Sequence, residues 1–69
     1  MLSEVERTVV EILKERGGRA TVREVAAELH RRGYSPRMAS NAFYYLAIKG
    51  VVRRAGKGLY ELAGGAETK

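Results

Sequence analysis

The chain lacks cysteine, tryptophan, aspartate and glutamine, and it has one proline among 69 residues. Without cysteine there is no disulfide framework and no thiolate zinc site, so the hydrophobic core must hold the fold. His30 is the only histidine, and we therefore expect no metal site. No apolar run approaches the roughly 18 residues that span a bilayer, and the N-terminus lacks a secretion signal. These absences predict a cytoplasmic protein without a cofactor.

Arrangements typical of catalysis are lacking as well. The chain has no cysteine or aspartate and no histidine near a plausible nucleophile. The segment Gly56-Lys57-Gly58 is too short for a phosphate-binding loop, and it precedes a predicted strand instead of a helix. We expect neither an enzyme nor a small-molecule ligand. The low amide content, with Asn41 as the only asparagine, is one trend of thermophilic proteins.

What the chain does contain is segregated charge, with a formal net charge of +5. Residues 1–29 and 61–69 each have a net charge of −1, whereas the stretch from His30 to Tyr60 carries seven bases and no acid. The seven bases are Arg31, Arg32, Arg37, Lys49, Arg53, Arg54 and Lys57. A field of one sign steers association with phosphate backbones or anionic membrane surfaces. The charge pattern therefore predicts a polyanionic partner.

Three helix-start signals precede Gly50. The first two are capping boxes, in which a hydroxyl N-cap precedes a glutamate by three residues: Ser3 with Glu6 and Thr21 with Glu24. The third is a serine N-cap with proline at the first helical position, Ser35-Pro36. Apolar residues at helical intervals follow the first two signals most clearly, and a glycine ends each of the three segments. We expect helices over 4–16, 22–32 and 36–49, with an extended segment at 19–20.

A strand pattern follows Gly50. The segments 51–55 and 59–62 flank a glycine-rich turn, and this arrangement indicates a β-hairpin. The residues 64–69 offer nothing to bury, so we expect a flexible C-terminal tail after a domain of residues 1–63. The predicted fold class is α+β and mostly α.

Two short helices joined by a tight turn at Gly33, with a hairpin after the second, form a helix-turn-helix with a wing. Three segments carry a family resemblance: Thr21-Val22-Arg23-Glu24-Val25-Ala26, Leu46-Ala47-Ile48-Lys49-Gly50-Val51-Val52-Arg53-Arg54 and Gly58-Leu59-Tyr60-Glu61-Leu62. Over about residues 4–62 the chain resembles the winged helix-turn-helix family, in particular small prokaryotic transcription regulators of the MarR-like, ArsR-like and antitoxin types. The resemblance implies a three-helix fold in the order helix, strand, helix, helix, strand, wing, strand.

In the resembling family, one side of the third helix enters the major groove of DNA. Helical wrapping places one group on the core side, Met38, Ala39, Ala42, Phe43 and Leu46, and another on the opposite side, Arg37, Ser40, Asn41, Tyr44 and Ile48. Arg37 and Asn41 are the candidate base readers, because arginine pairs with guanine and asparagine with adenine. Ser40, Tyr44 and the amides after Ser35 are candidate phosphate contacts. The alternative is an ordinary solvated helix face.

The predicted wing adds further basic candidates. Lys57, between two glycines, suits a wing tip on the DNA backbone or in the minor groove, with a plain soluble turn residue as the alternative. Strand alternation puts Arg53 and Arg54 on opposite faces, so one of them is expected to reach nucleic acid, and Arg54 matches the family's basic position. The complete set of predicted DNA-binding residues is Ser35, Arg37, Ser40, Asn41, Tyr44, Lys49, Arg53, Arg54 and Lys57.

These features predict sequence-specific binding of double-stranded DNA by a nucleoid-associated transcription regulator. If about five of the seven bases meet phosphates, the logarithm of affinity should fall with that of salt concentration at a slope of about −4 to −5. Leu2 and Val10 give the first helix more apolar surface than one small core requires. We therefore expect a homodimer on a palindrome with half-sites about 34 Å apart.

Other interpretations stay open. Ile48, apolar within the DNA-facing side, favours a winged-helix module that binds a protein partner. A small architectural nucleoid protein would bind DNA without sequence preference. Tyr34 and Tyr44 are aromatics that suit stacking on RNA or single-stranded DNA. The Z-DNA-binding branch of winged helices has an asparagine one turn before a tyrosine on the third helix. Tyr44 matches that tyrosine, but Ser40 stands at the position of the asparagine.

Overall fold

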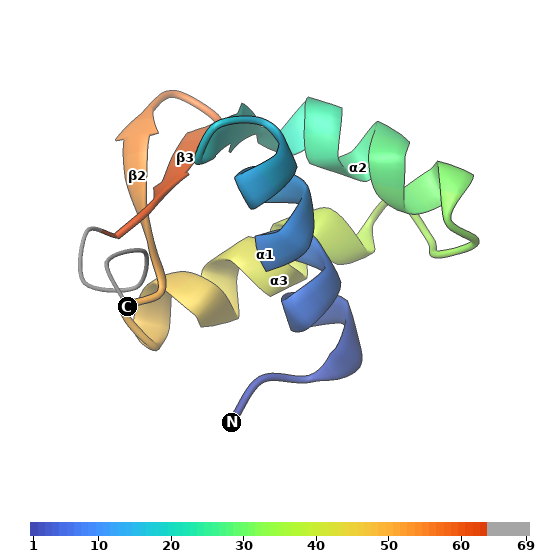
Figure 1. Cartoon of the computed structure of the whole chain (residues 1–69), viewed down its shortest axis with the longest axis horizontal. Coiled ribbons are helices and arrows are strands. Elements are labelled where there is room, and N and C mark those ends of the chain that lie inside the picture. Colours follow the sequence, from blue (N-terminus) through green and yellow to red (C-terminus); the bar gives the residue numbers. More distant parts are fainter. Residues whose placement is uncertain (64–69) are drawn as a thin grey trace.

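The computed structural model describes residues 1–63. Within them, three helices pack against a three-stranded antiparallel sheet, as Figure 1 shows. The elements in chain order are α1 (Glu4–Glu15), β1 (Arg19–Thr21), α2 (Val22–Arg31), α3 (Met38–Ile48), β2 (Val52–Gly56) and β3 (Leu59–Leu62). This confirms the predicted α+β class and the order of the elements. The predicted flexible tail at 64–69 lies outside the described residues.

Both predicted capping boxes form, and they set where α1 and α2 begin. The Glu6 amide donates to Ser3 Oγ at 3.2 Å, and the Ser3 amide donates to Glu6 Oε1 at 2.8 Å. Thr21 and Glu24 exchange the same two bonds, at 3.0 and 2.9 Å. Each of the two helices ends one residue before its predicted end, and the arginine that follows is its C-cap.

α3 is shorter at both ends than the predicted helix, and the expected N-cap at Ser35 is wrong. The segment from Ser35 to Arg37 forms a turn instead, in which the carbonyls of Ser35 and Pro36 accept the amides of Met38 and Ala39 at 3.0 and 3.2 Å. These bonds join residues three apart, a tighter winding than that of an α-helix. The α-helix therefore begins only at Met38, and Arg37 is its N-cap without a side-chain cap bond.

The sheet has the strand order β1–β3–β2, so β3 lies in the middle. β1 is the predicted extended segment, and it pairs with β3 to complete the sheet. Ala55 is an extra residue in β2, because the register shifts between Arg54 and Gly56. Lys57 and Gly58 form the turn of the hairpin, and Gly58 has a φ of +66°, a left-handed conformation that glycine adopts without strain.

The core lies between the helices and the inner face of the sheet. Its largest fully buried side chains are Val9, Ile12, Leu13, Val25, Leu29, Phe43 and Leu46. Phe43 of α3 stacks on Tyr60 of β3 with ring centroids 4.5 Å apart, which joins the helix to the hairpin. Met38 does not belong to this core as predicted. It is the first residue of α3, it borders a surface groove beside α1, and it is 39% exposed.

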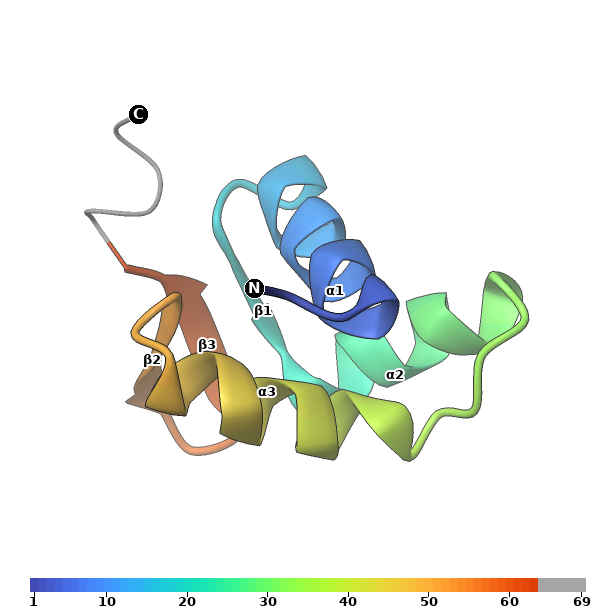
Figure 2. The same cartoon turned by 90° about the horizontal axis from the view of Figure 1, so that it is seen from below.

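The two elements predicted to touch DNA lie on the same side of the molecule. Figure 2 shows α1 along one edge of the molecule, and α3 and the turn of the β2–β3 hairpin toward the opposite edge. Figure 1 shows that the turn lies at the start of α2 and not next to α3. A flat or convex partner that contacts α3 can therefore also contact the hairpin turn without meeting α1.

Candidate nucleic-acid interface

The exposed side of α3 is uncharged and begins with an arginine. Arg37, Ser40 and Asn41 are exposed. Tyr44 and Ile48 are the most exposed of the large hydrophobic residues on the helix, at 62% and 64%. All five predicted residues of this stripe therefore face solvent, as the helical wrapping indicated. Ser35 is also exposed, in the turn before the helix.

The two flanks of α3 face different parts of the protein. On one flank, the Phe43 ring stacks on Tyr60, so the hairpin lies beside the helix. The other flank faces α1 across a groove of about 150 Å³ lined by Ser3, Val5, Glu6, Met38, Asn41, Ala42 and Tyr45. Asn41 thus lies between the exposed stripe and this groove. Tyr45 packs edge-to-face against Tyr44, with ring centroids 5.2 Å apart.

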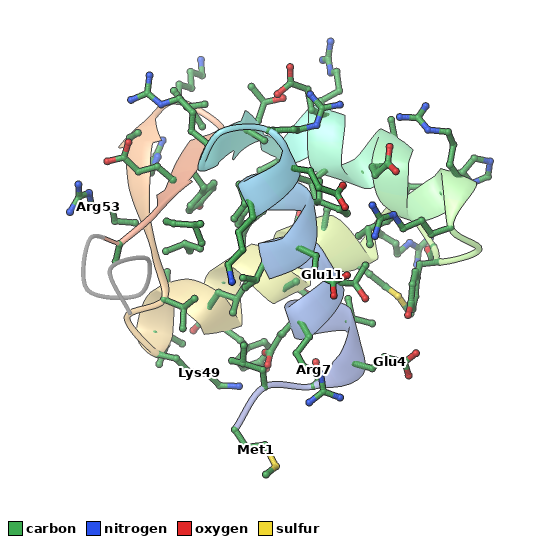
Figure 3. The ribbon with its side chains drawn as sticks, viewed as in Figure 1. Met1, Glu4, Arg7, Glu11, Lys49 and Arg53 are labelled. Atoms are coloured by element: carbon green, nitrogen blue, oxygen red, sulfur yellow. The ribbon has the colours of Figure 1, made fainter. Side chains whose placement is uncertain are left out.

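Strand pairing assigns Arg53 and Arg54 to opposite faces of the hairpin. Arg54 pairs with Tyr60, and Tyr60 pairs with buried Ala20, so this row lies on the face that the helices cover. Arg53 pairs with Glu61 on the outer face, where its Nε donates to Glu61 Oε2 at 2.7 Å. In Figure 3, Arg53 projects away from the helices. Arg54 is therefore the member of the pair that lies on the α3 side.

The hairpin turn meets the start of α2, which adds a cation that the sequence analysis missed. Lys57 and Gly58 border one depression with Thr21, Val22, Arg23 and Glu24. The Val22 amide donates to the Gly58 carbonyl at 2.9 Å and holds the turn against α2. Arg23 is exposed and joins Lys57 in this depression. Nothing in the local sequence around Arg23 indicates this neighbour, because only the folded sheet brings the two segments together.

Lys49 points away from the exposed stripe and toward the N-terminal segment. Its Nζ donates to Glu6 Oε1 at 2.8 Å and to the Met1 carbonyl at 3.1 Å, and Figure 3 shows its side chain directed at the start of α1. Glu6 is 6% exposed and is the one buried charged residue among residues 1–63. The hydrogen bond from Lys49, with that from the Ser3 amide, lowers the pKa of Glu6 below its usual 4.5. The predicted DNA contact of Lys49 therefore competes with a structural ion pair.

Ion pairs divide the seven bases of the acid-free stretch into two groups. Four of them have a glutamate partner: Arg31, Arg32, Lys49 and Arg53. Arg31 and Arg32 both bind Glu28, and their hydrogen bonds lower the pKa of that carboxyl. Within residues 1–63, Arg37, Arg54 and Lys57 have no carboxylate within 4.0 Å. The unpaired cations of the stretch are thus those at the start of α3 and on the hairpin.

The aromatic and apolar residues behind two other expectations have intramolecular contacts. Tyr34 is half-buried and donates its hydroxyl to Glu4 Oε2 at 3.0 Å, so Tyr44 alone remains of the two aromatics expected to stack on single strands. Leu2 and Val10, on which the homodimer rests, are half-buried and pack against the core. Leu2 and Val10 are therefore not evidence for a homodimer. The homodimer itself stays an untested prediction.

Two further features of the described part of the chain concern metal ligands and membrane spans. Residues 1–63 contain no group of three or more metal-ligating side chains, and none of their helices is long and apolar enough to cross a membrane. Comparison of the chain with protein-family models, with curated proteins and with solved structures gives no match. The charge and chemistry of the exposed surface are therefore the observations that bear on function.

Proposed function

We propose that the chain is a winged helix-turn-helix domain that binds double-stranded DNA in a sequence-specific way and regulates transcription. In this proposal α3 enters the major groove, and the β2–β3 hairpin is a wing on the backbone or in the minor groove. The order of elements supports it, since α2, a short turn and α3 are followed at once by the hairpin. The contact of Phe43 with Tyr60 keeps the hairpin beside α3.

The observation that carries the proposal is the position of four of the six basic side chains that have no carboxylate within 4.0 Å in residues 1–63. The other two, Arg7 and Lys14, lie on α1. Arg37 begins α3, Arg54 lies on the α3 side of the hairpin, and Lys57 lies at its turn. Arg23 at the start of α2 adds a fourth cation without a carboxylate partner in residues 1–63. Cations that have no carboxylate partner are available to phosphates. Arg37 and Arg54 lie beside the uncharged helix α3, and Lys57 and Arg23 lie together where the hairpin turn meets the start of α2.

The chemistry of the exposed stripe suits contacts to bases. Arg37 has the geometry for a bidentate contact with guanine O6 and N7, and Asn41 for one with adenine N6 and N7. Ser40 and Ser35 offer hydroxyls for phosphate oxygens. The phosphate contacts position and orient the protein, whereas the base contacts of Arg37 and Asn41 supply the preference for one sequence.

The test is the salt dependence of duplex binding, measured by fluorescence anisotropy between about 50 and 200 mM salt. With Arg23, Arg54 and Lys57 at phosphates and Arg37 on a base, the slope of log affinity against log salt should be about −3, shallower than the value that five phosphate contacts would give. Lys57→Ala should make the slope less negative by about 1. Lys14→Ala is the matched control, because Lys14 is an exposed cation on α1, on the opposite side from α3, and should leave the slope unchanged.

Equal effects of Lys57→Ala and Lys14→Ala would show that net charge, and not this surface, drives binding. Equal affinity for every duplex would support a nucleoid protein without sequence preference instead.

A second candidate function is a winged-helix module that binds a protein partner. The observation that favours it is that α3 has no charged residue between Met38 and Ile48, while Tyr44, Tyr45 and Ile48 are more than half exposed. Tyrosine and other large apolar residues are typical of the centres of protein interfaces. Absence of any salt-sensitive binding to duplex DNA would favour this function over the first.

A further inference from the structure

The uncharged surface of α3 limits the base pairs that this helix can bind. The eleven residues from Met38 to Ile48 include no lysine, arginine or acidic residue. Their exposed side chains away from the α1 groove are Ser40, Tyr44, Ala47 and Ile48, with Asn41 at the border of the groove. Any direct reading of bases by the body of this helix must therefore rely on one amide, hydroxyls and apolar groups.

These groups discriminate between base pairs in the major groove. The side chains that bind a G·C pair best are arginine or lysine at guanine O6 and N7, or a carboxylate at the cytosine amino group. The body of α3 offers none of these. An A·T pair presents adenine N6 and N7, which suit an asparagine, and the thymine 5-methyl group, which packs against apolar side chains. Both kinds of group are present on α3.

The geometry of the helix brings these groups to successive base pairs. Asn41, Tyr44 and Ile48 recur at helical spacing along the exposed side, and Ile48 and Tyr44 are 64% and 62% exposed. The eleven residues of α3 span about 16 Å at 1.5 Å per residue, close to the rise of about five base pairs at 3.4 Å each. The Tyr44 ring on this surface makes an edge-to-face contact with Tyr45.

The cations around this surface favour DNA over a protein as its occupant. Arg37 precedes α3, while Arg54 and Lys57 lie on the hairpin beside it, and none has a carboxylate partner within residues 1–63. An apolar strip with unpaired cations along its borders is complementary to a major groove, in which thymine methyls lie between two phosphate backbones.

We propose that α3 reads A·T pairs, with Tyr44 and Ile48 packed against thymine 5-methyl groups, Asn41 on an adenine, and Arg37 on a single guanine at the start of the helix. This inference rests on the proposed DNA-binding function. It predicts an operator whose half-site has a run of A·T pairs next to one G·C pair.

The experiment has two stages. First, selection from a random duplex library should enrich such an A·T run. Second, each thymine of the selected site is replaced by uracil, which lacks only the 5-methyl group. Wild-type affinity should fall about fourfold for each methyl group that packs on the helix, the equivalent of about 0.8 kcal/mol.

The variant Ile48→Ala should abolish the difference between thymine and uracil at one position and leave it at the others. Met38→Ala is the matched control, because Met38 is a partly exposed apolar residue of α3 that borders the α1 groove instead of the stripe. It should keep the full difference. Circular dichroism checks that both variants remain folded.

The outcomes separate the two proposals. Salt-sensitive binding with a G·C-rich motif, or with no difference between thymine and uracil at any position, overturns the A·T inference and leaves DNA binding intact. Absence of salt-sensitive duplex binding overturns the proposed function, and the inference with it. An A·T-rich motif with a methyl effect that Ile48→Ala removes and Met38→Ala retains supports both.

Discussion

The ammonium group of Lys49 lies 2.8 Å from a carboxylate oxygen of Glu6, which joins the C-cap of α3 to the first turn of α1. Glu6 also accepts the Ser3 amide in the capping box, so one buried carboxylate serves both the start of α1 and the end of α3. A charged group in the interior is tolerated when it is paired and hydrogen-bonded in this way. The pair therefore fixes α1 relative to the proposed recognition helix.

Replacing Lys49 by Met should reduce stability without weakening DNA binding. The substitution keeps the apolar stem but leaves the buried carboxylate without its cation, and we expect a loss of about 1–2 kcal/mol in the free energy of unfolding. Urea denaturation measures it. Lys14→Met, at an exposed position of α1, is the control and should change stability by less than about 0.5 kcal/mol. A variant of Lys49 with normal stability and reduced affinity for duplex DNA would instead make Lys49 a DNA contact.

The same pair predicts how acid destabilises the protein. The folded state lowers the pKa of Glu6 below 4.5, chiefly through the hydrogen bond from Lys49, so it favours the ionised carboxylate. Glu6 therefore adds stability above the unfolded pKa, and this contribution is lost as the pH falls below 4.5 through the folded value. In Glu6→Gln, stability should fall less steeply with acid than in the wild type, as urea midpoints at successive pH values would record. Parallel curves for the two proteins would contradict the assignment.

Arg53 and Arg54 are neighbours in sequence, and their alanine variants should behave differently. Arg54→Ala removes an unpaired cation on the α3 side of the hairpin, and it should make the salt slope of duplex binding less negative by about 1. Arg53→Ala removes a cation that faces outward and pairs with Glu61, and it should leave the slope nearly unchanged. A larger effect from Arg53→Ala would mean that the DNA lies on the outer face of the sheet.

The stacked rings of Phe43 and Tyr60 are predicted to hold α3 and the hairpin together. Phe43→Ala opens a cavity at a 1% exposed position, at a cost of about 3–5 kcal/mol. A domain of this size has a total stability of about 3–10 kcal/mol, so the variant should lose about a third or more of its stability and melt at a much lower temperature than the wild type. Tyr60→Phe keeps the ring and should stay folded. Thermal melting followed by circular dichroism distinguishes the two, and a stable Phe43→Ala protein would contradict this account of the core.

Local signals predicted most of the secondary structure correctly. The capping boxes at Ser3 and Thr21 work because each joins residues three apart, so the chain needs no distant partner to form them. The Ser35-Pro36 signal predicted a helix with Ser35 as its N-cap, but α3 begins only at Met38. The same two residues are equally compatible with a turn bonded at three-residue spacing, which is what the structure has.

The candidate site was predictable only in part. Helical periodicity placed Arg37, Ser40, Asn41, Tyr44 and Ile48 on one exposed side, because that pattern depends on the helix alone. The neighbourhood of Arg23 and Lys57 depends on the contact between the hairpin turn and the start of α2, and the sequence carries no local sign of it. The same holds for the partner of Lys49, which lies at the other end of the chain's helical part.

The amino-acid sequence by itself determined the helices, the hairpin and the separation of basic from acidic segments, because capping, turn chemistry and charge are properties of neighbouring residues. Helical spacing alone brings Glu28 to Arg31 and Arg32, three and four residues away. Only the tertiary structure decided the partners of the other bases, because ion pairing depends on distance in space, and folding brings Glu6 onto Lys49 and Glu61 onto Arg53. Within residues 1–63 folding leaves Arg37 and Arg54 without a carboxylate partner beside α3, a helix that carries no charge of its own, and it leaves Lys57 without one at the hairpin turn beside the start of α2.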